Sequence, residues 1–198
     1  KRDAFTQQFG INTYESLAEI LAMSDIDGVI ITVPNEQHFA VAKQIAEAGK
    51  HVYSEKPISN ILADGLRMEA LQKEYNVAMT VGHSARLLKG IQMMKDNLDK
   101  GALGKLAFIE ANFSNERALE LTPDTWRWYR DRAPGGPLSQ LAIHMFDILH
   151  FLGGDVAAVS SVASKLSPVG AEVDDQSMSI VRFKNGVLGY VGSCWSSP

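Results

Sequence analysis

The chain has 198 residues, of which 45% are hydrophobic, and its formal net charge is −4. This charge argues against a nucleic-acid-binding surface, because affinity for the phosphate backbone comes mainly from clustered Lys and Arg. No apolar run approaches the ~20 residues that cross a bilayer, and the single cysteine, Cys194, cannot form an internal disulfide. We therefore expect a cytoplasmic globular protein without a nucleic-acid or membrane partner, and we predict no metal site.

The first half of the chain alternates predicted helices and strands. Helix-spaced apolar residues cover 14–23, and a run of β-branched residues at 29–33 is typical of a parallel strand covered on both faces. A helix is predicted over 35–48, with Asn35 able to cap its start and Gly49 to end it. A short strand at 51–54, a helix from Ser59 or Asn60 to about Tyr75 and a strand at 77–81 follow. This order predicts a parallel α/β layer.

Past Gly82 the pattern changes to longer strands. An amphipathic helix is predicted at 89–100, and strands at 107–113, 156–164, 177–183 and 187–193. Asn185-Gly186 is a strong hairpin signal between the last two strands. Only one further helix, at 137–152, interrupts them, so we expect an α+β domain with an antiparallel or mixed sheet. The predicted domain boundary lies near Arg86.

Three segments, at 32–38, 54–57 and 82–86, directly follow predicted parallel strands, where such sheets bind ligands. Residues 32–38 close one strand and open a helix whose amides favour a polar or anionic ligand, although a plain capped turn has the same composition. Glu55-Lys56-Pro57 could present a lysine that donates a proton or a hydrogen bond to a substrate oxygen. The competing interpretation of this second segment is an exposed charge pair.

A further candidate segment is the predicted helix at 137–152, which follows Gly135-Gly136. Gln140, His144 and Asp147 occupy one face at i, i+4 and i+7. His144 could act as a catalyst or as a satisfied structural residue. Metal binding by His144 with Asp147 or His150 is disfavoured, because spacing identifies no third ligand.

Taken in this order, the segments resemble the family of glucose-fructose oxidoreductase, inositol dehydrogenase and the rhizopine-catabolism oxidoreductases. The resemblance covers nearly the whole chain, and no single motif carries it. The motifs are the turn at 32–35 with His38, residues 48–52 leading to Glu55-Lys56-Pro57, Val81-Gly82 with Arg86, Trp126-Arg127, Gly135-Gly136 with His144 and Asp147, Asp174-Asp175, and Asn185-Gly186.

The resemblance implies a fold, an activity and an assembly. Residues 1–85 would form the C-terminal part of a Rossmann-type parallel sheet, and residues 86–198 an α+β domain with an open, mostly antiparallel sheet for substrate binding and oligomerisation. The activity would be NAD- or NADP-dependent oxidation or reduction of CH–OH groups in a sugar, cyclitol or related polyol. A homo-oligomer would form through the open sheet.

The same resemblance implies roles for individual residues. Lys56 would hydrogen-bond the reacting oxygen, His144 would take the hydroxyl proton, and Gln140 would complete the catalytic set. The implied cofactor-binding residues are Thr32, Pro34, Asn35, His38, Glu55, Lys56, Pro57, Trp126 and Arg127. The Lys56-Pro57 peptide bond is expected to be cis.

Two departures from the family pattern leave alternatives open. Gln140 stands where the family usually has Asp, and an amide cannot accept a proton at neutral pH. No Gly-x-Gly-x-x-Gly is present, so we expect that about 60 residues are missing ahead of Lys1 and that the end at Pro198 is early. A non-catalytic ligand-binding or regulatory protein on the same fold is the alternative function. A structural module that dimerises through its sheet is the third.

Overall fold

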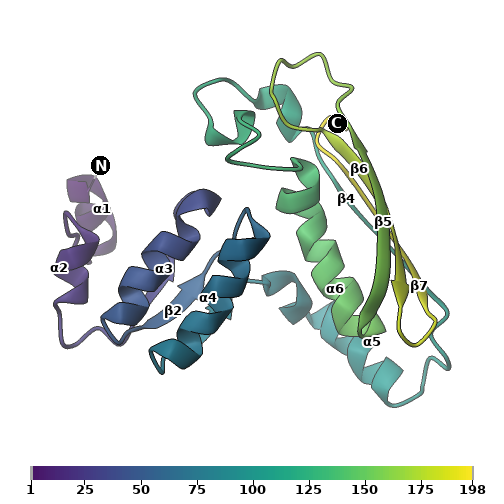
Figure 1. Ribbon diagram of the computed structural model, residues 1–198, viewed down its shortest axis with the longest axis horizontal. Helices are drawn as coiled ribbons and strands as arrows, with labels where there is room; N and C mark the ends of the chain where they lie inside the picture. The colour runs from purple at the N-terminus through teal and green to yellow at the C-terminus, as the bar shows by residue number, and fades with distance from the viewer. Residues whose placement is uncertain (1, 198) are drawn as a thin grey trace. The chain divides into compact units, whose positions relative to one another are not determined.

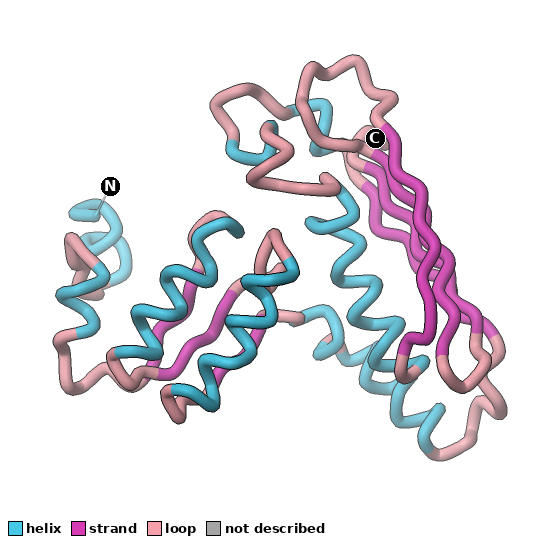
Figure 2. Tube along the Cα trace, viewed as in Figure 1, coloured by secondary structure: helices cyan, strands magenta, loops and turns pink. Residues whose placement is uncertain are grey.

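The computed structural model describes residues 2–197 and divides the chain into two compact units. The first unit comprises Lys1–Val33 and Gln37–Val81, and the second comprises Pro34–Glu36 and Gly82–Pro198. Both units combine helices and strands, which Figure 2 separates by colour. No helix in the described part of the chain is long and apolar enough to span a membrane.

The first unit is built on a three-stranded parallel sheet in the order β1-β2-β3. The predicted alternation of helices and strands is confirmed, with α1 (Arg2–Phe9) as an addition that the apolar pattern does not indicate. The other elements are α2 (Leu17–Leu21), β1 (Gly28–Ile31), α3 (His38–Glu47), β2 (His51–Ser54), α4 (Leu62–Glu74) and β3 (Met79–Val81).

The core of the first unit lies between its sheet and the helices α3 and α4, which run side by side (Figure 1). Ile31 and Val52 point into this core and are 2% and 3% exposed. Their neighbours on the opposite face, Ile30 and Tyr53, are 69% and 39% exposed. The expectation of a strand covered on both faces is therefore wrong within residues 2–197, because the helices pack on one side of β1 and β2.

The helix predicted at 35–48 begins with a tighter turn. Residues Asn35–Gln37 form the 3₁₀ turn η1, and Gln37 is the N-cap of α3 without a side-chain cap hydrogen bond. Asn35 therefore does not cap the helix. Gly49 has φ +72° just past its end, as expected for a helix stop.

The second unit carries a four-stranded sheet in the order β4-β7-β6-β5. β4 pairs parallel with β7, and the other two pairings are antiparallel, so the predicted open, mostly antiparallel sheet is confirmed. Its elements are η2 (Ser84–Leu87), α5 (Lys89–Asp99), β4 (Phe108–Ser114), η3 (Arg117–Glu120), η4 (Trp126–Trp128), η5 (Leu138–Ala142), α6 (Ile143–Gly153), β5 (Val156–Ser164), β6 (Gln176–Phe183) and β7 (Leu188–Cys194).

One face of this sheet is covered by α6, which runs along the strands (Figure 1). Leu149 of α6 packs with Val181, Phe183 and Val191 from β6 and β7. The alternate positions on the other face are open, and Ile180 is 62% exposed. The predicted hairpin is also confirmed, since Asn185 and Gly186 join β6 to β7 with Gly186 at φ +88°.

Candidate functional site

The Glu55-Lys56-Pro57 segment directly follows β2 in the first unit. The Glu55 amide donates to the Ile31 carbonyl at the end of β1 (3.0 Å), which continues the parallel pairing for one residue past the strand. The Glu55 carboxylate is exposed and accepts from the Lys56 amide at 3.2 Å. Pro57 is buried, and the Lys56-Pro57 bond is cis, as expected. Lys56 is thus held at the carboxyl end of a parallel strand, where such sheets bind ligands.

His38, the first residue of α3, is completely buried and joins two loops of the first unit. Its Nδ1 lies 2.8 Å from the Pro57 carbonyl oxygen and its Nε2 lies 3.0 Å from the Val33 carbonyl oxygen. Both ring nitrogens are therefore used within the protein. This geometry indicates that His38 holds the loop that carries Lys56 in place. Thr32, in contrast, is exposed and accessible to a ligand.

Asn35 and Glu36 follow Pro34 in the turn η1. Asn35 is 5% exposed, and its Nδ2 is a buried donor with no hydrogen-bond partner among residues 2–197. The Glu36 Oε2 is likewise buried without a partner in that range. Buried polar atoms are nearly always hydrogen-bonded, so these two fit a site that is completed by a polar ligand.

Gln140 and His144 lie at the start of the long helix of the second unit. The predicted helix at 137–152 is present, but its first turn is the π-helical η5, and α6 begins only at Ile143. Gln140 is 6% exposed and His144 is half-buried, with its ring 6.2 Å from that of Phe113. Single π turns occur frequently at functional sites, where they change the direction of neighbouring side chains.

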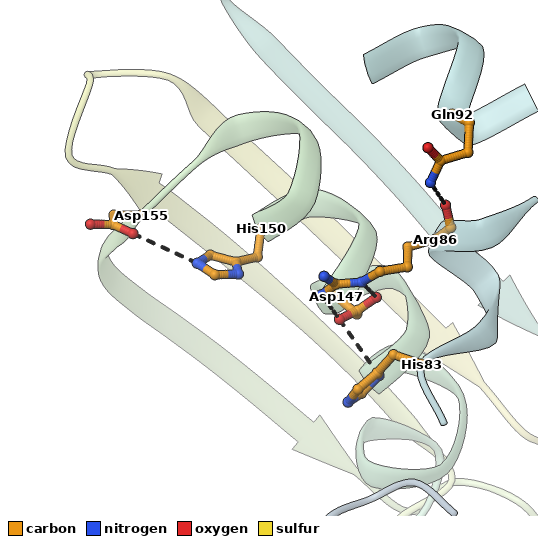
Figure 3. Close-up of polar contacts among 6 residues, drawn as sticks. All are labelled: His83, Arg86, Gln92, Asp147, His150 and Asp155. Carbon is orange, nitrogen blue, oxygen red and sulfur yellow. Dashed lines mark hydrogen bonds and ion pairs between the residues drawn. The ribbon is translucent and has the colours of Figure 1, made fainter. Parts of the chain in front are cut away.

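Asp147, one turn beyond His144, forms an ion pair with Arg86 of η2 (Figure 3). The Arg86 Nε donates to Asp147 Oδ2 at 2.8 Å, and the Arg86 Nη2 donates to Oδ1. The His83 Nδ1 lies 3.6 Å from the same Oδ1. The side chain of Asp147 is only 7% exposed, so this carboxylate is a buried junction between η2 and α6.

Trp126 and Arg127 lie in the 3₁₀ turn η4 and are both half-buried. The Arg127 guanidinium stacks 4.3 Å from the centroid of the Trp126 ring. Burial, together with the charge of Arg117, lowers the pKa of Arg127 below its ordinary value. A half-buried guanidinium of this kind is suited to planar hydrogen bonding with a carboxylate, phosphate or ribose oxygen.

Comparison with known proteins covers both units. Residues 1–83 match a family described as "Oxidoreductase family, NAD-binding Rossmann fold", and residues 91–198 match "GFO/IDH/MocA C-terminal domain". The chain belongs to the Gfo/Idh/MocA oxidoreductase family. The family inferred from the motifs is thereby confirmed.

Gfo/Idh/MocA relatives of known structure share the fold over the whole chain. A putative NADPH-dependent oxidoreductase from Desulfitobacterium hafniense is 39% identical with a TM-score of 0.93, covering 100% of this chain and 57% of that one. A levoglucosan dehydrogenase in complex with NADH and levoglucosan is 28% identical with a TM-score of 0.92, covering 99% and 55%.

A curated Gfo/Idh/MocA relative, 1,5-anhydro-D-fructose reductase from Ensifer adhaerens, is 30% identical over 93% of this chain and 56% of its own length. The chain spans about half the length of the curated relatives it matches.

Sequence reasoning placed Asp147 on the helix face of His144 and placed Arg86 in a separate family motif, but it did not pair them. Their partnership depends on a contact across 61 residues. Two signals were available. Residues 82–86 follow a predicted parallel strand, and two Gfo/Idh/MocA motifs supply an arginine and a carboxylate, each outside the predicted catalytic set.

Proposed function

We propose that the protein containing this chain is an NAD- or NADP-dependent oxidoreductase that acts on a CH–OH group of a sugar, cyclitol or related polyol. The observation that carries the proposal is the position of Lys56. This lysine follows β2, a strand of the parallel sheet, in a chain that belongs to an oxidoreductase family. Two of the three relatives named above are a dehydrogenase of levoglucosan and a reductase of 1,5-anhydro-D-fructose.

Thr32, Pro34, Asn35, His38, Glu55, Lys56, Pro57, Trp126 and Arg127 are the residues that we propose hold the dinucleotide. The buried, unsatisfied Nδ2 of Asn35 fits this assignment, because a polar group of a ligand would complete its hydrogen bonding. His38 would contribute by holding the loop that carries Lys56. When bound, the nicotinamide accepts or supplies the hydride.

We assign the proton chemistry to His144. An imidazole can gain and lose a proton near neutral pH, so it can take the hydroxyl proton as the carbonyl forms and return it in the reverse direction. Lys56 would hydrogen-bond the same reacting oxygen and stabilise its developing negative charge. Gln140 would bind substrate as a hydrogen-bond donor and acceptor but would not transfer a proton, since an amide is neither acidic nor basic near neutral pH.

The test uses the protein encoded by the longest reading frame that contains this chain, here termed the expressed protein. It is titrated with NAD(H) and NADP(H), and sugars and polyols are then screened at the absorbance of the reduced nicotinamide. We expect binding of at least one cofactor, and turnover that Lys56→Ala abolishes. Lys73→Ala, an exposed lysine of α4, is the matched control. Failure of both cofactors to bind would rule the proposal out.

A non-catalytic binding or regulatory role is the weaker candidate. Gln140, in place of the usual Asp, is the observation that favours it. The names of the matched relatives point instead to dehydrogenases and reductases. If Lys56→Ala and His144→Ala both left every measurable function of the expressed protein intact, the binding role would replace the catalytic one.

We also propose that residues 86–198 provide a homo-oligomeric interface and that residues 1–85 bind the cofactor. The open face of the second sheet exposes apolar residues in adjacent strands: Val162, Met178 and Ile180 are 64%, 55% and 62% exposed. Contiguous apolar surface of this kind is typical of interfaces. Ile180→Asp should lower the mass measured by light scattering, whereas Leu166→Asp, in the loop after β5, should not. Oligomerisation without any small-molecule binding would favour the structural-module hypothesis.

A cytoplasmic location is part of the proposal. Its support is the single cysteine, Cys194, which is free in the structure and has no partner for an internal disulfide. Cell fractionation with an antibody against the chain would test it, and recovery from a secreted fraction would contradict it.

A further inference from the structure

The ion pair that joins η2 to α6 is more constrained in geometry than a typical surface ion pair. Arg86 uses two nitrogens, Nε and Nη2, on the two oxygens of Asp147, which is the side-on bidentate arrangement (Figure 3). The Asp147 side chain is 7% exposed, so its carboxylate is shielded from solvent, whereas the Arg86 side chain is 36% exposed. A bidentate fork restricts rotation as well as distance, which a single hydrogen bond does not.

Two further contacts hold the arginine itself. The Gln92 side chain donates to the Arg86 carbonyl oxygen at 2.7 Å, which anchors η2 to α5 (Figure 3). The guanidinium also lies 5.4 Å from the centroid of the Phe151 ring on α6. Arg86 therefore contacts α6 at two positions one turn apart, Asp147 and Phe151.

This double contact bears on His144, which precedes Asp147 by three residues. Side chains at i and i+3 of an α-helix share one face, so whatever fixes the rotation of α6 at Asp147 also fixes the direction of His144. The helix needs such a restraint at its start, because the preceding turn is the π-helical η5, whose backbone hydrogen bonds do not continue the α-helical ladder.

We propose that Arg86 and Asp147 are positioning residues for His144: their bidentate pair holds α6 in the rotation that aims the imidazole at the substrate. This inference rests on the proposed function, in which His144 takes the hydroxyl proton. Neither residue of the pair takes part in proton transfer, and both act through the histidine.

The kinetic test compares Arg86→Lys, Asp147→Asn and the surface control Asp99→Asn in the expressed protein. Lys keeps the charge but cannot form the fork. We expect both test variants to lower kcat ten- to a hundredfold, the scale of a misaligned catalytic group, with the cofactor KM within about twofold of wild type. Asp99 is exposed near the end of α5, where it pairs with Lys95, so Asp99→Asn should leave kcat unchanged.

The decisive comparison repeats Arg86→Lys in a His144→Ala background. If the pair acts through the histidine, the second change lowers kcat no further. A full additional loss would overturn the positioning role. If His144→Ala alone has a wild-type kcat, the proposed role of His144 is wrong, which is a separate result.

A second measurement does not depend on turnover. The titration midpoint of the His144 imidazole is followed by NMR in Arg86→Gln and Asp147→Asn. The first leaves the Asp147 carboxylate without its guanidinium partner, one turn from His144, and should raise the midpoint. The second leaves the Arg86 guanidinium without its carboxylate partner and should lower the midpoint.

Other ionisable groups among the described residues lie near the pair or near α6. His83 is 3.6 Å from Asp147, Lys95 is 5.8 Å from the centroid of the Phe151 ring, and His150 of α6 pairs with Asp155. All of them are unchanged in both variants. Midpoints that stay equal to wild type, or that move in the same direction, would show that the pair does not act on His144.

Discussion

The imidazole of His38 connects two loops of the first unit, because its Nδ1 lies 2.8 Å from the Pro57 carbonyl oxygen while its Nε2 lies 3.0 Å from the Val33 carbonyl oxygen. Carbonyl oxygens only accept hydrogen bonds, and a fully buried ring has no water to replace them. The loop that carries Lys56 therefore depends on a side chain at the start of α3.

Replacing His38 should loosen this loop. His38→Ala removes both contacts and leaves a cavity, for which we expect a loss of about 2–4 kcal/mol in the stability of the first unit. Amide hydrogen exchange of β1 and β2 measures the loss. Gln44→Ala, at an exposed position of the same helix, is the control and should change the exchange little. Equal protection in the two variants would show that His38 does not hold the loop.

Gly136 should tolerate no side chain. A Cβ at this position would clash with the Asp174 carbonyl oxygen, and the φ of +47° at Gly136 is unfavourable for other residues. Gly136→Ala should therefore destabilise the second unit by about 2–4 kcal/mol, measured by thermal unfolding. Gly90→Ala is the matched control, since nothing lies within 4 Å of its Cβ and α5 favours alanine. The control should be neutral or slightly stabilising.

Asp175 should make the second unit sensitive to acid. Its carboxylate is buried, which favours the neutral acid, but hydrogen bonds from Ser167 and Leu166 outweigh burial and hold the pKa of Asp175 below its ordinary value of 3.8. A lowered pKa in the folded state stabilises the fold above the unfolded-state pKa, and this stabilisation disappears as the pH falls through the folded value.

Asp175→Asn should accordingly be less stable than wild type at neutral pH, and the difference should shrink below about pH 4. Denaturant unfolding at several pH values measures it. Asp131→Asn, an exposed acid, serves as the control. A pH-independent difference would mean that Asp175 contributes through packing alone.

His144→Ala should reduce kcat of the expressed protein about 10²-fold or more, because it removes the proposed proton acceptor. Cofactor affinity should be retained, which separates a chemical defect from a folding defect. His150→Ala, exposed on the same helix, is the matched control. A wild-type kcat in His144→Ala would contradict the role.

Gln140→Asp tests the departure from the family pattern. If Gln140 merely replaces the usual carboxylate, the change should be neutral or raise kcat, because an acid can share the proton with His144. Gln140→Leu should lower kcat or raise the substrate KM by leaving the substrate hydroxyl without a partner. Collapse of activity in Gln140→Asp would show that the amide has a function of its own.

Much of this protein could be predicted from local pattern. The strands at 51–54 and 156–164 are observed at the predicted bounds, and the Asn185-Gly186 hairpin joins the two strands it was expected to join. Apolar runs, turn residues and short motifs act over a few neighbours, so they report strand and helix positions directly. The order of the motifs was also enough to identify the family.

Contacts between distant segments were decided only by the tertiary structure. The parallel pairing of β4 with β7 and the Arg86–Asp147 pair are examples. Each depends on which elements the topology brings side by side. A hydrogen bond between residues 61 positions apart produces no repeating pattern in the sequence, because neither partner constrains the residues beside it.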